Sequence, residues 1–329
     1  MKTRIADLLS YCSGVDFGTV PFSQKEKDFR DDLNHKMLSF LKFLPESTQE
    51  EAFKFLMYSL RTSIAEGLNF VRYFYVPAWS ILFWLHRTCP DKRKLGPNYL
   101  KDAKIGHNMA MYLHALDDHL ADGQLPVTHL TLLVRSQAWM HLNQAFGRLA
   151  RGVEKGGAIV SDFVNDYYSS IETSDQLESL DSYCDLFRKQ MATWLIAPVL
   201  LAKKISTNEE FVRSIESSYV SFGIAWRLLD DIQDLEKDLK KGVHSSLYIC
   251  LPTTIKKVWN RVKEEKVDRK EGSVGRVLNY IQKNGLIDFV KQRICTELES
   301  AASRAEKCDL AGFAAELRCL SKPLWNGHK

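Results

Sequence analysis

Several common features are absent from this sequence of 329 residues, and each absence narrows the classes of protein to consider. The seven cysteines are scattered singly, with no Cys-x-x-Cys pair and an odd total. This pattern argues against a disulfide framework or a cysteine zinc site and indicates reduced thiols inside the cell. The formal charge of +4 is small for the length of the chain and argues against nucleic acid as a partner.

Long apolar runs are also absent. Residues 1–18 lack the continuous apolar stretch of a secretory signal. The two most apolar segments, residues 73–85 and 191–202, are far shorter than the roughly 20 residues needed to cross a bilayer. We therefore expect a soluble, cytoplasmic protein with no transmembrane segment, in which both segments are buried helices.

Helical periodicity dominates the sequence from about residue 24 onward, and there is no alternating strand pattern, internal repeat or linker-like break in composition. Apolar residues make up 45 % of the chain, which is enough for a sizeable core. We predict an all-α protein in which one helical bundle surrounds a central apolar cavity. We expect one very apolar helix over residues 180–204. Pro77 should kink or interrupt its helix, and the charged residues 262–273 should form a solvated loop.

The expected helix over residues 209–239 begins apolar and ends in a group of acids. Residues four apart share one face of a helix, so Asp230, Asp234 and Asp238 should stand in one column. The same face carries Phe222 and Trp226 before the acids. Like charges at this spacing repel each other, and a divalent cation with oxygen ligands would offset the repulsion.

A second acid cluster lies earlier in the chain, where Asp117, Asp118 and Asp122 end another long apolar helix. Acids at a helix C-terminus oppose the macrodipole, so their occurrence at two helix ends favours a function. If the two helices face each other, both clusters lie at one end of a cavity, where Mg²⁺ ions would hold a diphosphate as a leaving group. Phe222 and Trp226 would line an apolar pocket below, in which a carbocation is stabilised and shielded from water.

These motifs resemble those of the class I isoprenoid synthase superfamily. Residues 222–234 are similar to the second aspartate-rich motif of trans-prenyltransferases, and residues 117–122 to the first, in a form also found in bacterial terpene cyclases. Residues 188–192 resemble the family's Lys-Thr pair, whose lysine contacts diphosphate, and this role is carried here onto Lys189. The resemblance runs from about residue 30 to the end of the chain.

The resemblance implies one isoprenoid synthase domain over residues 1–329, with a core of about 30–325 and an N-terminal extension of 1–23. It also implies a prenyl diphosphate substrate, a cluster of three Mg²⁺ ions and, because homodimers are common in the family, a possible homodimer. The predicted catalytic residues are Asp117, Asp118, Asp230 and Asp231. The predicted metal ligands are Asp117, Asp118, Asp122, Asp230, Asp234 and Asp238. The predicted substrate contacts are Lys189, Arg227, Arg72, Phe222 and Trp226.

Some of these roles have alternatives. Neighbouring residues on a helix point about 100° apart, so Asp117 and Asp231 can instead orient a ligand or bind a cation. Asp238 is either a third ligand of its column or an exposed acid. Arg227 either contacts diphosphate or pairs with Asp231 or Glu236.

The sequence departs from the pattern of chain-elongating prenyltransferases, which hold isopentenyl diphosphate with a Gly-Gly-Lys-Arg-x-Arg-Pro-like segment and an arginine pair after the first acid motif. Residues 66–72 keep at most Arg72, and residues 123–128 contain no arginine. Arg227 replaces the usual glutamine of the second motif, and Val243 follows Gly242 where a lysine is usual. Losing several charge-assisted contacts, each worth about 1.5–3 kcal/mol, would weaken binding of a second diphosphate by orders of magnitude.

These departures favour a class I terpene synthase, which would ionise a linear allylic prenyl diphosphate, release diphosphate and cyclise or rearrange the carbocation. The alternative is a trans-prenyltransferase, a polyprenyl diphosphate synthase that condenses an allylic diphosphate with isopentenyl diphosphate. A third possibility is a non-catalytic helical subunit of a prenyl synthase, in which the same departures represent decay.

Overall fold

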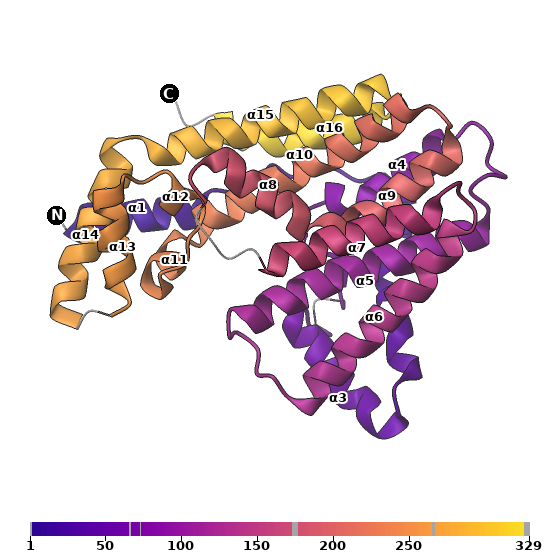
Figure 1. Cartoon of the computed structure of the whole chain (residues 1–329), viewed down its shortest axis with the longest axis horizontal. Helices are drawn as coiled ribbons and strands as arrows, with labels where there is room; N and C mark the ends of the chain where they lie inside the picture. Colours follow the sequence, from indigo (N-terminus) through magenta and orange to yellow (C-terminus); the bar gives the residue numbers. More distant parts are fainter. Residues whose placement is uncertain (1, 66, 73, 173–176, 265–266, 326–329) are drawn as a thin grey trace.

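The computed structural model describes residues 2–65, 67–72, 74–172, 177–264 and 267–325. The side chains of residues 2–6, 72, 172 and 267–271 also lie outside the description. Across the described ranges the chain forms helices and no strand, so the predicted all-α class is confirmed (Figure 1). Within the same ranges, no helix has the length and apolar character needed to span a membrane. The seven cysteines are free.

The helices of the first half are α1 (Lys2–Gly14), α2 (Gln24–Met37), η1 (Ser39–Phe43), α3 (Glu46–Ser59), η2 (Phe70–Arg72), α4 (Pro77–Thr88), α5 (Pro97–Ala121), α6 (His129–Ala150) and α7 (Gly156–Glu172). Those of the second half are α8 (Leu180–Gln190), α9 (Ala192–Ile205), α10 (Glu209–Gln233), α11 (Leu235–Lys241), α12 (Ser246–Ile249), α13 (Thr253–Val262), α14 (Val267–Lys283), α15 (Leu286–Lys307) and α16 (Ala311–Trp325).

Helix α10 is the centre of the bundle. It packs against α15 along one side and against α9, α8 and α4 on others. Figure 1 shows α15 and α16 running beside it, while α5, α6, α7 and α9 form the other half of the bundle. Buried apolar side chains from Leu8 to Leu324 belong to one hydrophobic core, so α1 shares the core of the main bundle.

Local sequence explains where several helices begin and end. Pro77 is the first residue of α4, a position at which proline's fixed φ is favourable. The interruption predicted at Pro77 is therefore the start of this helix. Asn208 caps α10 by accepting a hydrogen bond from the backbone N–H of Glu210. Gly242 ends α11 in the left-handed region, with a φ of 72°, as glycine readily does.

Three predicted elements need correction. The helix predicted over residues 209–239 is two helices, because the chain breaks at Asp234, where ψ is 8°. The helix predicted over residues 180–204 is likewise divided at Met191. The loop predicted over residues 262–273 is wrong from Val267 onward, where α14 begins.

The break at Asp234 changes the predicted acid column. Asp230 and Asp234 remain one turn apart at the end of α10. Asp238 lies on α11, a separate helix, and is 6 % exposed. The three acids therefore do not form one continuous face of a single helix.

Candidate active site

The C-terminal ends of α5 and α10 meet at one cavity of about 590 Å³. Asp118 lines it from α5, and Asp230 and Asp234 line it from the end of α10. One acid of the first cluster and two of the second, more than 100 residues apart in the sequence, therefore line the same cavity.

Two of the carboxyl groups that line this cavity, those of Asp118 and Asp230, have raised pKa values, because they are buried and lie close to other acids. The pKa of Asp230 is raised to about 6, chiefly by burial; the neighbouring acids Asp231, Asp234 and Asp118 act in the same direction and Arg227 acts in the opposite one. Burial also raises the pKa of Asp118, and Arg227 again acts in the opposite direction. Both groups are thus carboxylates whose charge a bound cation would stabilise.

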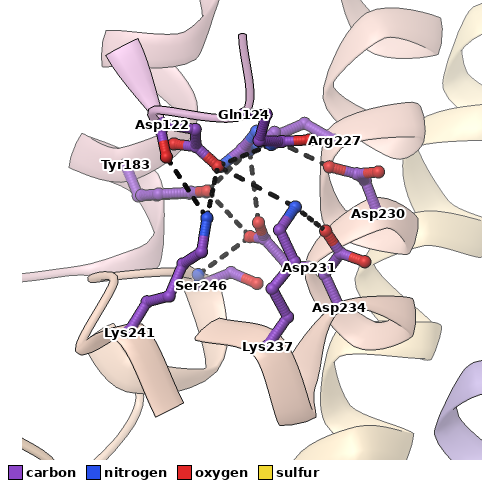
Figure 2. Close-up of polar contacts among 10 residues, drawn as sticks. All are labelled: Asp122, Gln124, Tyr183, Arg227, Asp230, Asp231, Asp234, Lys237, Lys241 and Ser246. Carbon is purple, nitrogen blue, oxygen red and sulfur yellow. Dashed lines mark hydrogen bonds and ion pairs between the residues drawn. The ribbon is translucent and has the colours of Figure 1, made fainter. Parts of the chain in front are cut away.

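Arg227 is the cation behind the second acid cluster. Its Nη1 lies 3.6 Å from Oδ2 of Asp230 and its Nε lies 3.2 Å from Oδ1 of Asp231. Nε also donates a hydrogen bond of 2.9 Å to the Tyr183 hydroxyl (Figure 2). The predicted pairing of Arg227 with Asp231 is therefore present.

Two lysines of α11 face the first acid cluster. Lys237 lies between the clusters, with its Nζ 2.7 Å from Oδ2 of Asp234 and 3.8 Å from Oδ2 of Asp122 (Figure 2). The Nζ of Lys241 is also 3.8 Å from Oδ2 of Asp122. Lys237 is among the residues that line the cavity, whereas Asp122, a predicted metal ligand, and Lys241 are not.

Asp231 and Asp238 are buried behind the cavity. Oδ2 of Asp231 accepts 2.8 Å hydrogen bonds from the Tyr183 hydroxyl and from the backbone N–H of Ser246 (Figure 2). Burial, followed by the charge of Asp231, raises the pKa of Asp238 to about 8. Neither acid is among the residues that line the cavity. Their burial separates them from Asp230 and Asp234, which line the cavity.

Asp117 points away from the cavity. Its Oδ1 accepts a 2.6 Å hydrogen bond from Nε of Arg135, and its Oδ2 accepts one of 2.6 Å from the Tyr167 hydroxyl. These partners lie on α6 and α7. The structure thus separates Asp117 from its neighbour Asp118.

The residues predicted to contact the substrate do not all line the cavity. Trp226 lines the cavity and packs against Phe74, Phe187 and Trp194 in an aromatic cluster. Phe222 is fully buried beside Tyr219 and is not part of the lining. Lys189 is exposed at the end of α8. The side chain of Arg72, at the end of η2, lies outside the described residues.

The cavity is also lined by residues for which the sequence predicted no role in the site: Asp16, Leu60, Arg61, Tyr75 and Gln124 outside the two motifs, and His119 and Gln233 within them. Gln233 has a local signal, since it directly precedes Asp234 at the end of α10. Arg61 and Asp16 have none, because both lie outside the aspartate-rich segments and reach the cavity through tertiary packing.

Within the described ranges, no group of three or more His, Cys, Asp or Glu residues is arranged to hold a metal ion by itself. Mg²⁺, however, usually keeps several waters and binds one or two carboxylates together with substrate phosphates. Asp118, Asp230 and Asp234 at one opening, two of them with raised pKa values, provide such carboxylates. The residues present therefore fit metal ions that are bound jointly by protein and diphosphate.

No family model and no curated protein matches this sequence. Among solved structures, geranylgeranyl pyrophosphate synthetase from Pyrococcus horikoshii is 13 % identical, with a TM-score of 0.65 over 98 % of this chain and 99 % of that one. A decaprenyl diphosphate synthase from Rhodobacter capsulatus is 16 % identical, with a TM-score of 0.65 over 99 % of both chains. The chain has the class I isoprenoid synthase fold. This confirms the predicted fold, and the structural neighbours named here are prenyl synthases.

Proposed function

We propose that this protein is a Mg²⁺-dependent trans-prenyltransferase that joins an allylic prenyl diphosphate to isopentenyl diphosphate. The observation that carries the proposal is the single cavity lined by Asp118 of α5 and by Asp230 and Asp234 of α10. A geranylgeranyl pyrophosphate synthase from Corynebacterium glutamicum, with a TM-score of 0.56 and 14 % identity, is complexed with isoprenyl diphosphate and magnesium. That neighbour supports the same ligands here.

In this proposal, Asp118, Asp230 and Asp234 hold Mg²⁺ together with the phosphate oxygens. The bound ions supply Lewis-acid stabilisation of the leaving diphosphate. The expected number of three ions remains a prediction. Asp122 contributes by pairing with Lys237 and Lys241, and Asp231 contributes by positioning Arg227.

The other lining residues have roles that follow from their charge and shape. Arg61 and Lys237 are cations at the cavity and would bind phosphate oxygens. Trp226 presents an indole to the same space, and its face can stabilise positive charge at the allylic carbon. Its packing against Phe74 and Trp194 keeps the ring in one orientation.

The lining favours transfer over cyclisation. A cyclase must fold the whole hydrocarbon chain in a dry, apolar space to protect successive carbocations from water. Among the described lining residues, Leu60, Trp226 and the ring of Tyr75 are the apolar surfaces, and the rest are polar. We therefore prefer prenyl transfer to the terpene synthase reaction that the sequence motifs favour.

Two alternatives each have an observation behind them. Cyclisation is favoured by the scarcity of cations for a second diphosphate, since Arg61 and Lys237 are the only lysine or arginine side chains among the described lining residues. A non-catalytic subunit is favoured by the ion pairs that Lys237 and Lys241 already make with the acids.

We also infer that residues 1–329 form one domain, because α1 packs within the common core. The homodimer remains a prediction.

A product assay separates these functions. The protein is incubated with Mg²⁺ and geranyl, farnesyl or geranylgeranyl diphosphate, with and without isopentenyl diphosphate. The proposal predicts a longer prenyl diphosphate only when both substrates are present. A cyclic hydrocarbon or alcohol made from the allylic substrate alone would contradict prenyl transfer and support cyclisation. No diphosphate release with any substrate would support the non-catalytic subunit.

A further inference from the structure

The short segment between α1 and α2 forms part of the cavity wall. Asp16 lines the cavity beside the acid clusters. It also lines a second hollow of about 330 Å³ on its other side, together with Tyr11, Val15 and Lys291. Asp16 and the adjoining backbone therefore stand between the cavity and a space that opens toward α1 and the end of α16.

Hydrogen bonds from two cavity-lining residues hold this segment in place. Gln233 at the end of α10 donates a 2.8 Å hydrogen bond from Nε2 to the carbonyl oxygen of Val15. Tyr75 donates its hydroxyl hydrogen to Oδ1 of Asp16. The same Oδ1 accepts a 2.7 Å bond from the backbone N–H of Phe17. The segment is thus attached to the second acid motif through the residue next to Asp234.

Apolar and backbone contacts attach its far side. Phe17 is buried, and its ring lies edge to face with that of Tyr75 at a centroid distance of 4.7 Å. The N–H of Gly18 donates a 3.0 Å bond to the carbonyl oxygen of Leu320 in α16. A Cβ at Gly18 would lie 2.0 Å from the carbonyl oxygen of Cys319, so only glycine permits this approach. The wall is therefore fixed at both faces.

We propose that residues 15–18 form a fixed wall of the active site that keeps bulk water from the reacting carbon, with Asp16 and Tyr75 as its positioning pair. The inference rests on the proposed function, because water matters only if an allylic cation forms. When water reaches that cation, its oxygen bonds to the allylic carbon and its proton passes to solvent. The products are then a prenyl alcohol and free diphosphate.

Two variants loosen the wall in different ways, and a third serves as a matched control. Gly18→Ala forces the segment away from α16, and Tyr75→Phe removes the hydrogen bond to Asp16 while keeping the ring against Phe17. Gly14→Ala is the control, because a Cβ at Gly14 meets no atom within 4 Å. Each protein is incubated with Mg²⁺, geranyl diphosphate and isopentenyl diphosphate in isotopically labelled water. Total diphosphate release and the share of labelled prenyl alcohol are then measured, together with hydrogen exchange at residues 15–18.

We expect Gly18→Ala and Tyr75→Phe to raise the share of labelled alcohol by about tenfold, equivalent to about 1.4 kcal/mol in the partition between the two routes. Gly14→Ala should match the unmodified protein in both the alcohol share and the total diphosphate release. Faster exchange at residues 15–18 with an unchanged alcohol share would overturn the wall inference alone. If Gly18→Ala does not fold, the result for Tyr75→Phe decides. No diphosphate release by the unmodified protein would instead contradict the proposed function, and the inference with it.

Discussion

Asp117 and Asp118 are adjacent in the sequence, but their side chains have different surroundings. Asp118 lines the cavity, whereas Asp117 pairs with Arg135 and Tyr167 between α5, α6 and α7. The sequence motif assigns both to metal binding, since a pattern of residue types does not show which neighbour a helix turns inward. The rotation of α5 in the bundle makes this distinction.

This difference predicts two separable effects. Asp118→Asn should lower diphosphate release by about 100-fold, because it removes about 3 kcal/mol of charge stabilisation from the site. Its free energy of unfolding should change little. Asp117→Asn should lower the free energy of unfolding by about 1–2 kcal/mol, because Arg135 and Tyr167 lose a charged partner. Urea denaturation measures the change in the free energy of unfolding, and an assay of diphosphate release measures the change in activity. Equal loss of activity in the two variants, without a change in stability, would contradict the assignment.

Arg227 gives a second prediction for a single residue. The pKa of Asp230 is raised to about 6, chiefly by burial, and Arg227 acts in the opposite direction, so the guanidinium favours the ionised form of this acid. In Arg227→Gln the pKa of Asp230 should rise by about one unit or more. Because Mn²⁺ binds the carboxylate and competes with its proton, the pH below which Mn²⁺ binding is lost should rise by the same amount. Mn²⁺ titrations followed by electron paramagnetic resonance at several pH values test this. Lys240→Gln is the control, since Lys240 pairs with Glu236 away from the cavity. An unchanged pH midpoint in Arg227→Gln would contradict the role of the guanidinium.

Among the helices, α4 and α16 are joined by a buried carboxyl group. Glu316 of α16 is 4 % exposed and accepts a 2.6 Å hydrogen bond from Nε1 of Trp84, and a second bond from the Ser80 hydroxyl. Its pKa is raised from the ordinary 4.5 to about 8, chiefly by burial and additionally by Glu26, whereas both hydrogen bonds act in the opposite direction. The folded protein therefore binds more protons than the unfolded chain between these two pH values.

Because of this extra proton on Glu316, the free energy of unfolding should fall as pH rises from 4.5 to about 8. One additional proton bound in the folded state gives a slope of at most about 1.4 kcal/mol per pH unit. In Glu316→Gln this contribution should disappear, because the amide does not titrate. Urea denaturation of both proteins across this pH range measures the difference in slope. Parallel pH profiles for the two proteins would contradict the raised pKa.

The helices themselves could largely be predicted from apolar periodicity, and Pro77 and Gly242 mark a start and an end. The breaks at Met191 and Asp234 could not be predicted, because neither residue is a strong helix breaker. At the first break, Met191 lies against α10, where a Cβ at Gly223 would come within 2.3 Å of its sulfur. That contact joins residues distant in sequence, so no local sequence pattern predicts it. The loop prediction for residues 262–273 failed because a charged stretch also forms the start of α14.

At the scale of the whole molecule, the bundle brings together residues from four separate parts of the chain. Asp16, Arg61, Asp118 and Asp230 line one cavity, although only the last two belong to recognisable motifs. The meeting of Asp118 with Asp230 could be predicted because both acids lie at the C-terminal end of a long apolar helix, and two such helices that face each other bring these ends together. The contributions of Asp16 and Arg61 depend on how the N-terminal segments cross the bundle, which side-chain periodicity does not specify.

The central claim is that the two acid clusters act together on one diphosphate. Isothermal titration of inorganic pyrophosphate, with and without Mg²⁺, tests it in the unmodified protein, Asp118→Asn, Asp230→Asn and the double variant. We predict binding only with Mg²⁺, loss of at least about tenfold in affinity in each single variant, and a double variant hardly weaker than either one, because both acids hold the same ions. Binding that does not depend on Mg²⁺, or losses that simply add in the double variant, would contradict a shared site.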